Sequence, residues 1–275
     1  MDLAARPSPN SDLTASARGF DQGPALLAIP FRQPSRGKAQ SLLSSKQRAA
    51  LAEVSAQVTV PKGAWLYRAG DAASFVYIIT SGYVRTSRAL ANGAQRVTSF
   101  RSGGDLLGLA AEGRYAETAQ ALATTSAYRV PLDALEDLLR KDPSLGLRLL
   151  CKAASIVAAQ QNHAMILGRP DALGKLAMFL ELLHRLQRER GWETEMIYLP
   201  MSRSDIADYV GLSIEAVSRT LTTLRERRVI VFRTSRQLRV LDAAKLKELI
   251  AGRRRRPVAA KQQRATNPAR AGEHI

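Results

Sequence analysis

The chain has 275 residues, 45% of them hydrophobic, so it can bury a sizeable core, and its length favours about two domains. Its Lys and Arg residues outnumber its Asp and Glu residues by 17, a balance that suits DNA, RNA or an anionic membrane surface. One cysteine excludes an intramolecular disulfide, no apolar run approaches the ~20 residues of a membrane span, and residues 1–13 lack an export signal's apolar core. We therefore expect a cytoplasmic protein without a membrane partner.

The composition divides the chain into five predicted parts. Residues 1–40 are rich in Pro, Ser, Gly, Gln and Arg and show little periodicity, which predicts a mobile extension. We expect a β-rich domain at 41–141, a helix at 142–168, a second domain at 169–251 and a basic tail at 252–275. The four consecutive arginines of the tail either contact flanking DNA or an anionic surface, or remain solvated.

Short strand-like segments, separated by glycine and aspartate, extend from Val58 to Arg129. The punctuating glycines recur about every 11 residues, a spacing typical of strand-turn units in a roll or barrel. They are Gly63, Gly70, Gly82, Gly93 and Gly104. Asn92-Gly93 predicts a hairpin turn between two of the strands. This half of the chain therefore predicts an antiparallel β-roll.

The segment Asp142–Gly168 is predicted to be helical, with Pro143 in its first turn and a stop at Gly168-Arg169-Pro170. Residues at three-four spacing predict a coiled-coil seam between two copies of the chain. They are Leu150, Ala153, Val157, Gln160, Ala164 and Leu167. The alternative is a helix packed only on its own β-roll. Cys151, beside the seam, is either a small buried hydrophobe or a redox-sensitive thiol.

A second amphipathic helix is predicted over Leu173–Arg190. Its inward-facing residues are Leu176, Phe179, Leu180 and Leu183. A stripe of this kind indicates a packed core and carries no chemistry.

Residues 201–230, MSRSDIADYVGLSIEAVSRTLTTLRERRVI, predict a helix-turn-helix. The first helix has Ser204 as its predicted cap and ends at Gly211, where the turn needs a positive φ. Its apolar face is formed by Ile206, Ala207 and Val210. Ser213 is the predicted cap of the second helix.

The second helix has two faces of different chemistry. Its inward positions are Val217, Leu221 and Leu224, and its outward positions are Glu215, Ser218, Arg219 and Thr222. Arginine can fork onto a guanine edge, glutamate can accept from a cytosine amine, and serine lets a helix approach the groove floor. The alternative is a helical hairpin with a solvated polar face.

Two β-rich runs follow, Val229–Phe232 and Leu238–Leu241, around a basic turn. We expect a wing with Arg233, Arg236 and Arg239 at or beside its tip, lying along the phosphate backbone. The alternative is an ordinary solvated hairpin. Residues 201–256 hold 14 basic and six acidic side chains, so part of the excess positive charge lies on this predicted reading module.

The runs LYRAGDAASFVYIITSGYVRT and RSGGDLLG look like a cyclic-nucleotide-binding β-roll. Together with the winged helix they resemble the Crp/Fnr superfamily of transcription regulators over about residues 44–250. Glu215, Ser218 and Arg219, as E-x-x-S-R, resemble the FNR and FixK branch, in which these residues read a TTG-type half-site. The cyclic-AMP receptor branch has arginine at the position of Ile214, and an apolar residue there suits contact with a thymine methyl.

The resemblance extends to the backbone contacts and to the assembly. It implies that phosphates are contacted by Ser213, Thr222, Arg233 and Arg236. It also implies that the helix 142–168 pairs two subunits, so that two recognition helices read an inverted repeat one DNA turn apart.

The resemblance predicts no ligand in the roll. Where cyclic-nucleotide responders hold phosphate with Gly-Glu and Arg-Ser pairs, this chain has Gly108-Leu109 and Glu117-Thr118, so an anion would meet a carboxylate. An iron–sulfur cluster needs about four thiolates, and the chain has only Cys151, as in a FixK-like regulator whose activity is set by its amount. A haem would need an axial ligand, and His163, His184 and His274 stand alone.

The sequence therefore predicts an α+β protein, with an N-terminal cyclic-nucleotide-binding-like antiparallel β-roll, a long dimerisation helix and a C-terminal winged helix-turn-helix. The resemblance implies a homodimeric activator that works with RNA polymerase on a TTGAT-N4-ATCAA palindrome, at genes for low-oxygen respiration or nitrogen metabolism, without cofactor or metal. One alternative is a sensor gated by haem, redox or a small molecule. Another is a scaffold or enzyme regulatory subunit, which has no need of E-x-x-S-R. No catalytic set or phosphate loop predicts an enzyme.

Overall fold

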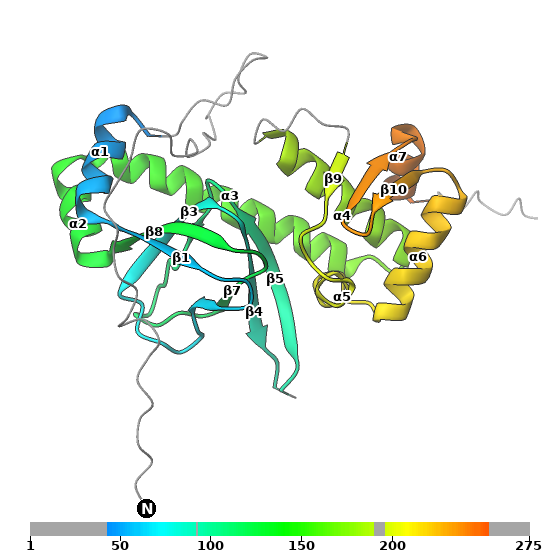
Figure 1. Cartoon of the computed structure of the whole chain (residues 1–275), viewed down its shortest axis with the longest axis horizontal. Helices are drawn as coiled ribbons and strands as arrows, with labels where there is room; N and C mark the ends of the chain where they lie inside the picture. The colour runs from blue at the N-terminus through cyan, green and yellow to red at the C-terminus, as the bar shows by residue number, and fades with distance from the viewer. Residues whose placement is uncertain (1–42, 92, 190–195, 253–275) are drawn as a thin grey trace, which may run out of the picture.

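The computed structural model describes residues 43–91, 93–189 and 196–252. The predicted extension 1–40, the tail beyond Gly252 and His274 lie outside the described residues. A β-rich body and a mainly helical body lie side by side, and the long helix α3 (Pro143–Gly168) runs from the first to the second (Figure 1). This arrangement is the α+β fold predicted from the sequence.

Two four-stranded antiparallel sheets form the β-roll, with strand orders β1-β8-β3-β6 and β2-β7-β4-β5. The strands are β1 (Ala56–Val60), β2 (Trp65–Tyr67), β3 (Phe75–Ser81), β4 (Tyr83–Ala89), β5 (Gln95–Ser102), β6 (Leu106–Leu107), β7 (Thr118–Ala121) and β8 (Thr125–Pro131). One buried cluster takes Val58 and Ile79 from the first sheet and Val84 and Ala119 from the second. The two sheets therefore face each other across a shared core.

Glycines make the turns of the roll, as their spacing predicted. All five of the punctuating glycines have positive φ, and at Gly82, between β3 and β4, an added Cβ would lie 2.5 Å from the Thr124 carbonyl oxygen. The predicted hairpin joins β4 to β5, with the Leu90 amide donating to the Ala94 carbonyl at 2.7 Å. Asn92 itself lies outside the described residues.

Two helices in the N-terminal half were not predicted from the sequence. Helix α1 (Ser45–Val54) begins with a capping box in which the side chains of Ser44 and Gln47 each bond the other's backbone amide. Helix α2 (Leu132–Lys141) follows β8 directly. Both cover the outer face of the first sheet, where Leu51 and Leu135 share a cluster with Val76 and Val130. Both helices lie outside the predicted strand region Val58–Arg129, and they are present because the outer sheet face needs helices to bury it.

Helix α3 begins where the sequence predicted. Asp142 caps it by accepting a hydrogen bond from the Ser144 amide at 3.0 Å, and Pro143 occupies the first turn. The helix is tied to the roll by a buried ion pair, Lys152 Nζ to Asp105 Oδ1 at 3.1 Å.

The C-terminal body contains the predicted helices and one unforeseen strand. Its elements are α4 (Ala172–Glu189), β9 (Met196–Tyr198), α5 (Arg203–Val210), α6 (Ile214–Glu226), β10 (Ile230–Thr234), β11 (Gln237–Val240) and α7 (Ala243–Ala251). Leu176, Phe179 and Leu180 of α4 are almost fully buried, as predicted. The hairpin β10-β11 gains β9 as a third strand, and the Gln187 side chain fixes β9 by bonding both the amide and the carbonyl of Tyr198.

None of the helices in the described ranges has both the length and the apolar character that crossing a membrane requires.

Candidate nucleic-acid interface

Helices α5 and α6 form the helix-turn-helix. Ser202 caps α5 by accepting from the Asp205 amide at 3.1 Å, while Asp205 accepts from the Ser202 amide at 2.8 Å. The predicted cap, Ser204, lies inside the helix, so that prediction was wrong by two residues. The predicted apolar face of Ile206, Ala207 and Val210 is buried.

The turn between the two helices depends on Gly211. It adopts the left-handed conformation with φ 67° and ψ 50°, as the sequence predicted. A Cβ at this position would come within 3.1 Å of both Arg96 Nη1 and Leu167 Cδ2. Glycine is therefore required here by backbone conformation and also by close packing.

Helix α6 lies at the outer edge of the molecule (Figure 1). Ser213 caps it by accepting from the Ala216 amide at 3.1 Å, as predicted. Its inward residues Val217, Leu221 and Leu224 are buried. Its outward residues Glu215, Ser218, Arg219 and Thr222 are all exposed, and Ile214 is 46% exposed although it is apolar. The helix therefore presents the predicted E-x-x-S-R face to solvent.

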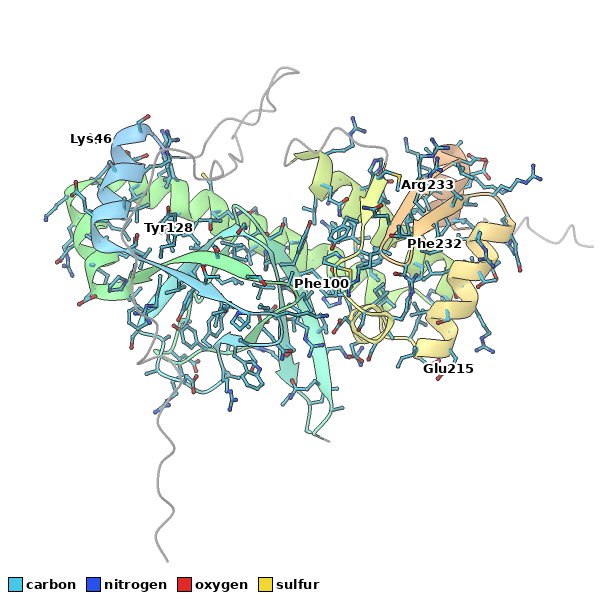
Figure 2. All side chains as sticks on the ribbon, in the orientation of Figure 1. Lys46, Phe100, Tyr128, Glu215, Phe232 and Arg233 are labelled. Carbon is cyan, nitrogen blue, oxygen red and sulfur yellow. The ribbon has the colours of Figure 1, made fainter. Side chains whose placement is uncertain are left out.

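Glu215 lies at the first turn of α6 and points away from the molecule (Figure 2). Its own backbone amide, then the Ser213 hydroxyl and the Arg219 charge hold the pKa of its carboxyl below the usual value. At neutral pH this side chain is therefore an ionised acceptor at the exposed end of the helix.

A polar groove separates α6 from the wing. It is lined by Arg203, Ser218, Leu221, Thr222, Arg225, Phe232, Arg233, Thr234 and Ser235. The Arg203 guanidinium lies 5.1 Å from the centre of the Phe232 ring, and burial lowers the pKa of Arg203. Figure 2 shows Phe232 and Arg233 at the wing. Three arginines and no acidic side chain line this groove, which makes it complementary to a phosphate backbone.

The sequence did not single out Arg203 or Arg225. Arg203 begins α5, and it reaches the groove because the folded wing places Phe232 beneath its guanidinium. No local pattern in the sequence links residues this far apart. Arg225 was a detectable candidate, because it continues the outward positions Ser218 and Thr222 by one turn of α6.

The wing turns at Ser235-Arg236, with both residues exposed. Arg233 lies beside this tip, at the end of β10, as predicted. Arg239 does not: it is half-buried in the central strand β11, paired with Val231 and Met196. That prediction was wrong because β11 is flanked by strands on both edges, β10 and the unforeseen β9, so Arg239 lies within the sheet and not at the tip.

Helix α3 carries an apolar exposed face. Of the nine large apolar side chains exposed in the described residues, four lie on this helix, namely Leu147, Leu150, Val157 and Met165. Among the predicted seam residues, Leu150, Val157 and Ala164 are exposed, whereas Ala153, Gln160 and Leu167 are half-buried in their own subunit. The exposed stripe combines Leu150, Val157 and Ala164 with a second set of exposed residues, Leu147, Ala154 and Gln161. The Leu167 side chain packs against the turn at Gly211.

Cys151 and the histidines on described elements have ordinary surroundings. Cys151 is half-buried on α3. His163 is buried, and its Nε2 lies 2.7 Å from the Tyr209 carbonyl oxygen, while His184 is half-buried on α4. In the described ranges no group of three or more His, Cys, Asp or Glu side chains is arranged to hold a metal ion.

Tyrosine rings fill the interior of the roll beside Gly108. Tyr67 stacks on Tyr115 with ring centroids 4.0 Å apart and lies 5.6 Å from the Tyr77 ring. A Cβ at Gly108 would already lie 3.2 Å from the Tyr115 ring. Burial, and next the Glu117 carboxylate, raise the pKa of Tyr67.

Glu117 and Thr118 occupy the positions at which the family pattern has Arg-Ser. Glu117 Oε1 lies 3.9 Å from Nε of Arg88, a side chain that is 57% exposed, so this ion pair is weak. The Thr118 hydroxyl already accepts from the Ala69 amide at 3.0 Å. The Glu117 carboxylate is close enough to the buried tyrosines to raise the pKa of Tyr67, and the exposed Arg88 compensates its charge only weakly.

Two domain families match the chain. Residues 57–142 match the cyclic nucleotide-binding domain, and residues 174–249 match the Crp-like helix-turn-helix domain. The structure is similar to that of FixK2 from Bradyrhizobium japonicum, with a TM-score of 0.67 and 30% identity, covering 72% of this chain and 98% of that one.

Two curated relatives are each 32% identical to the chain. The fumarate and nitrate reduction regulatory protein of Salmonella typhi matches over 164 residues, which are 59% of this chain and 66% of that protein. The anaerobic regulatory protein of Haemophilus influenzae matches over 173 residues, 62% of this chain and 67% of that protein. The match thus spans about two thirds of the length of each. The chain belongs to the Crp/Fnr superfamily of transcription regulators.

Proposed function

We propose that the protein binds duplex DNA as a homodimer, reads an inverted TTG…CAA repeat without a cyclic nucleotide, and activates transcription. The observation that carries this proposal is the outward face of α6, on which Glu215, Ser218 and Arg219 stand exposed beside a groove lined with arginines. A solvent-exposed helix with this chemistry fits the major groove.

Each base-reading residue has a chemical role in the proposal. Arg219 forks onto the guanine of TTG, and the ionised Glu215 accepts from the amine of the paired cytosine. Ser218 lets the helix approach the bases closely, and the exposed apolar side chain of Ile214 contacts a thymine methyl.

Backbone contacts surround these residues. Ser213 and Thr222 bind phosphate on either side of the reading face, while Arg233 and Arg236 bind it from the wing. The groove adds Arg203 and Arg225 to this set, and the Phe232 ring holds Arg203 in place. These contacts supply affinity without sequence information and make binding dependent on salt.

The dimer in this proposal forms along α3. An exposed stripe that includes Leu147, Leu150 and Val157 leaves a single copy with an uncovered apolar helix face, which a second copy would bury. To read two half-sites on one face of the DNA, the two α6 helices of the dimer must lie about 34–36 Å apart, one turn of DNA, and the operator is then an inverted repeat.

The roll supports independence from cyclic nucleotides. Three tyrosine rings fill its interior, and Glu117 would repel a phosphate there. We infer that the DNA-binding state forms from the protein alone.

The regulated genes follow from the relatives. Two of them are named for fumarate and nitrate reduction and for anaerobic regulation, which favours genes for low-oxygen respiration or nitrogen metabolism and recruitment of RNA polymerase.

Fluorescence anisotropy tests the proposal with the purified full chain and a labelled TTGAT-N4-ATCAA duplex, without any nucleotide. We expect specific binding tighter by about 2–6 kcal/mol than to a duplex in which both guanines are replaced, because each mismatched base pair costs about 1–3 kcal/mol. Added cyclic AMP or cyclic GMP should leave the affinity unchanged. Strict dependence on either nucleotide, or equal affinity for the two duplexes, contradicts the proposal. Transcription with purified RNA polymerase from a promoter carrying the repeat then tests activation.

A further inference from the structure

The β-roll and the helix-turn-helix are joined by a partly buried ion pair. Arg85 of β4 holds Gln120 Oε1 through Nε at 3.1 Å and Nη2 at 2.8 Å, and its Nη1 pairs with Asp205 of α5. The Asp205 side chain is only 7% exposed. Gln120 thus fixes the guanidinium on the roll, and Asp205 meets it from the DNA-binding body.

Asp205 is also the residue that completes the capping box of α5. Its Oδ2 accepts from the Ser202 amide and hydroxyl at 2.8 and 2.7 Å, while Oδ1 pairs with Arg85. The cap needs only Oδ2, so it survives if the two bodies separate. Oδ1 has Arg85 as its charged partner only while the two bodies are docked. Loss of Arg85 therefore penalises the docked arrangement, because it leaves a carboxylate buried with incomplete compensation.

Strand β5 provides a second contact. Arg96 Nη1 donates to the Asp208 carbonyl at 3.3 Å, near the end of α5. Val97 is 1% exposed and belongs to the core cluster of the DNA-binding body, although it lies on a strand of the roll. The absence of a side chain at Gly211 allows Arg96 to approach.

Aromatic rings form a third contact between the β-roll and the DNA-binding body. Phe100 of β5 lies where the two bodies meet (Figure 2), 5.2 Å from the Tyr209 ring and 6.2 Å from the Phe179 ring between centroids. His163 of α3 stacks on the same Tyr209 ring that lies beside Phe100. The roll, the long helix and the helix-turn-helix therefore share one packed junction, which we call the joint: Arg85, Arg96, Val97, Phe100, His163, Asp205 and Tyr209.

We propose that the joint holds α6 at a fixed orientation relative to α3 in the absence of any ligand, and that Arg85 is a positioning residue for operator binding. This inference rests on the proposed function. If the competent orientation is one of several, the apparent affinity falls in proportion to its population. A fixed orientation in both subunits fixes the separation of the two recognition helices and hence the spacing of half-sites that the dimer accepts.

The spacing of the half-sites gives a readout that a merely stabilising residue does not affect. One base pair added to or removed from the spacer shifts a half-site by about 3.4 Å and rotates it by about 35°. Wild-type protein and Arg85→Gln are titrated against repeats with spacers of three, four and five base pairs. For Arg85→Gln we expect the preference for the four-base spacer to fall roughly 5- to 150-fold, the range of typical coupling energies. Discrimination at the guanine within a half-site should stay unchanged.

Arg88→Gln is the matched control. Arg88 lies on the same strand as Arg85, but it pairs with Glu117 and donates to the Ala116 carbonyl, both of which belong to the roll. It should keep the wild-type spacing preference. In an Asp205→Asn background, where the amide oxygen can still accept from Ser202, Arg85→Gln should cause little further change. Thermal unfolding and sedimentation verify that each variant is folded and dimeric.

A second measurement tests the joint without DNA. Spin labels at Lys62→Cys on the roll and Lys247→Cys on α7, in a Cys151→Ser background diluted with unlabelled protein, report the distance between the two bodies. We expect a narrow distribution in the otherwise wild-type chain and a broad one with Arg85→Gln. An unchanged distribution overturns the inference, and so does an unchanged spacing preference when the wild-type protein does prefer the repeat. If neither the wild type nor any variant prefers the repeat, but Arg85→Gln still broadens the distance distribution, the proposed function is contradicted and the role of the joint is still supported.

Discussion

The imidazole of His163 on α3 stacks on the phenol ring of Tyr209 on α5, with centroids 3.9 Å apart and planes 6° from parallel. Its Nε2 lies 2.7 Å from the Tyr209 carbonyl oxygen, so the neutral ring donates its proton there. Burial raises the pKa of Tyr209 to about 12, so its phenol stays protonated at neutral pH. The contact between the long helix and the helix-turn-helix is therefore made by two uncharged rings.

This contact predicts a pH dependence of stability. Burial, opposed by the hydrogen bond to Tyr209 and reinforced by the charge of Arg96, lowers the pKa of His163. The unfolded chain then binds more protons than the folded one near pH 6, so stability is full above the unfolded pKa of about 6.5 and falls as the pH drops below it.

Urea unfolding of the wild-type protein and His163→Gln between pH 8 and pH 5.5 measures this effect. Glutamine can donate to the same carbonyl but does not titrate, so the stability advantage of the wild type should shrink with falling pH, by about 1.4 kcal/mol per unit of pKa shift. A difference that stays constant over this range contradicts the assignment of a neutral, buried His163.

The caps of α5 provide a second prediction. Ser202→Ala should destabilise the protein by about 1 kcal/mol, because it removes the acceptor for the Asp205 amide. Ser204→Ala lies within the helix, is exposed and should change stability by less than about 0.5 kcal/mol. Chemical denaturation of both variants decides between the two serines, and a larger loss at Ser204 would restore the cap expected from the sequence.

The sequence predicted the elements whose signals are local. The glycine-punctuated strands, the start of α3 with Pro143 in its first turn, the left-handed turn at Gly211 and the inward and outward faces of α6 all depend on residues within one or two turns of each other. The serine cap of α5 was misplaced because Ser202 and Ser204 both precede the apolar face, and the capping box with Asp205 distinguishes them.

The remaining features depend on packing between distant segments. Helix α1 has only two buried residues, Gln47 and Leu51, and therefore a weak periodic signal, although its capping box was readable. The stripe on α3 was ambiguous because Leu150, Val157 and Ala164 can be combined with either of two sets of neighbours. The fold decides between the two sets, because Leu167 lies against the turn of the helix-turn-helix at Gly211. The Arg85–Asp205 pair joins residues 120 positions apart and has no sequence signal.

The third prediction concerns the dimer. Val157→Glu places a charge on an α3 side chain that is 57% exposed in one copy, so the fold of the subunit should tolerate it. Across a twofold seam the two carboxylates would face each other, a like-charge contact that costs several kcal/mol and should weaken self-association and operator binding together. Leu90→Glu is the control, because Leu90 is 40% exposed and lies at the β4-β5 hairpin of the roll, away from α3. Sedimentation that finds Val157→Glu fully dimeric refutes the α3 interface.

The last prediction separates base reading from phosphate binding. Arg219 lies on the exposed face of α6, whereas Arg236 forms the tip of the wing. Arg219→Ala should cost about 1–3 kcal/mol on the cognate repeat and remove discrimination at the guanine of TTG. Arg236→Ala should weaken binding to all sequences alike and reduce the slope of log affinity against log salt by about one unit per contact.

Both variants are compared on the cognate repeat and on a repeat with the guanine replaced, over a series of salt concentrations. Arg239→Ala is the matched control, since this arginine lies in the central strand and away from the tip. Its salt slope should equal that of the wild type, provided that thermal unfolding shows the wing intact. Full guanine preference in Arg219→Ala would mean that α6 lies in the groove with another register, and the E-x-x-S-R assignment would then fail for Glu215 and Ser218 as well.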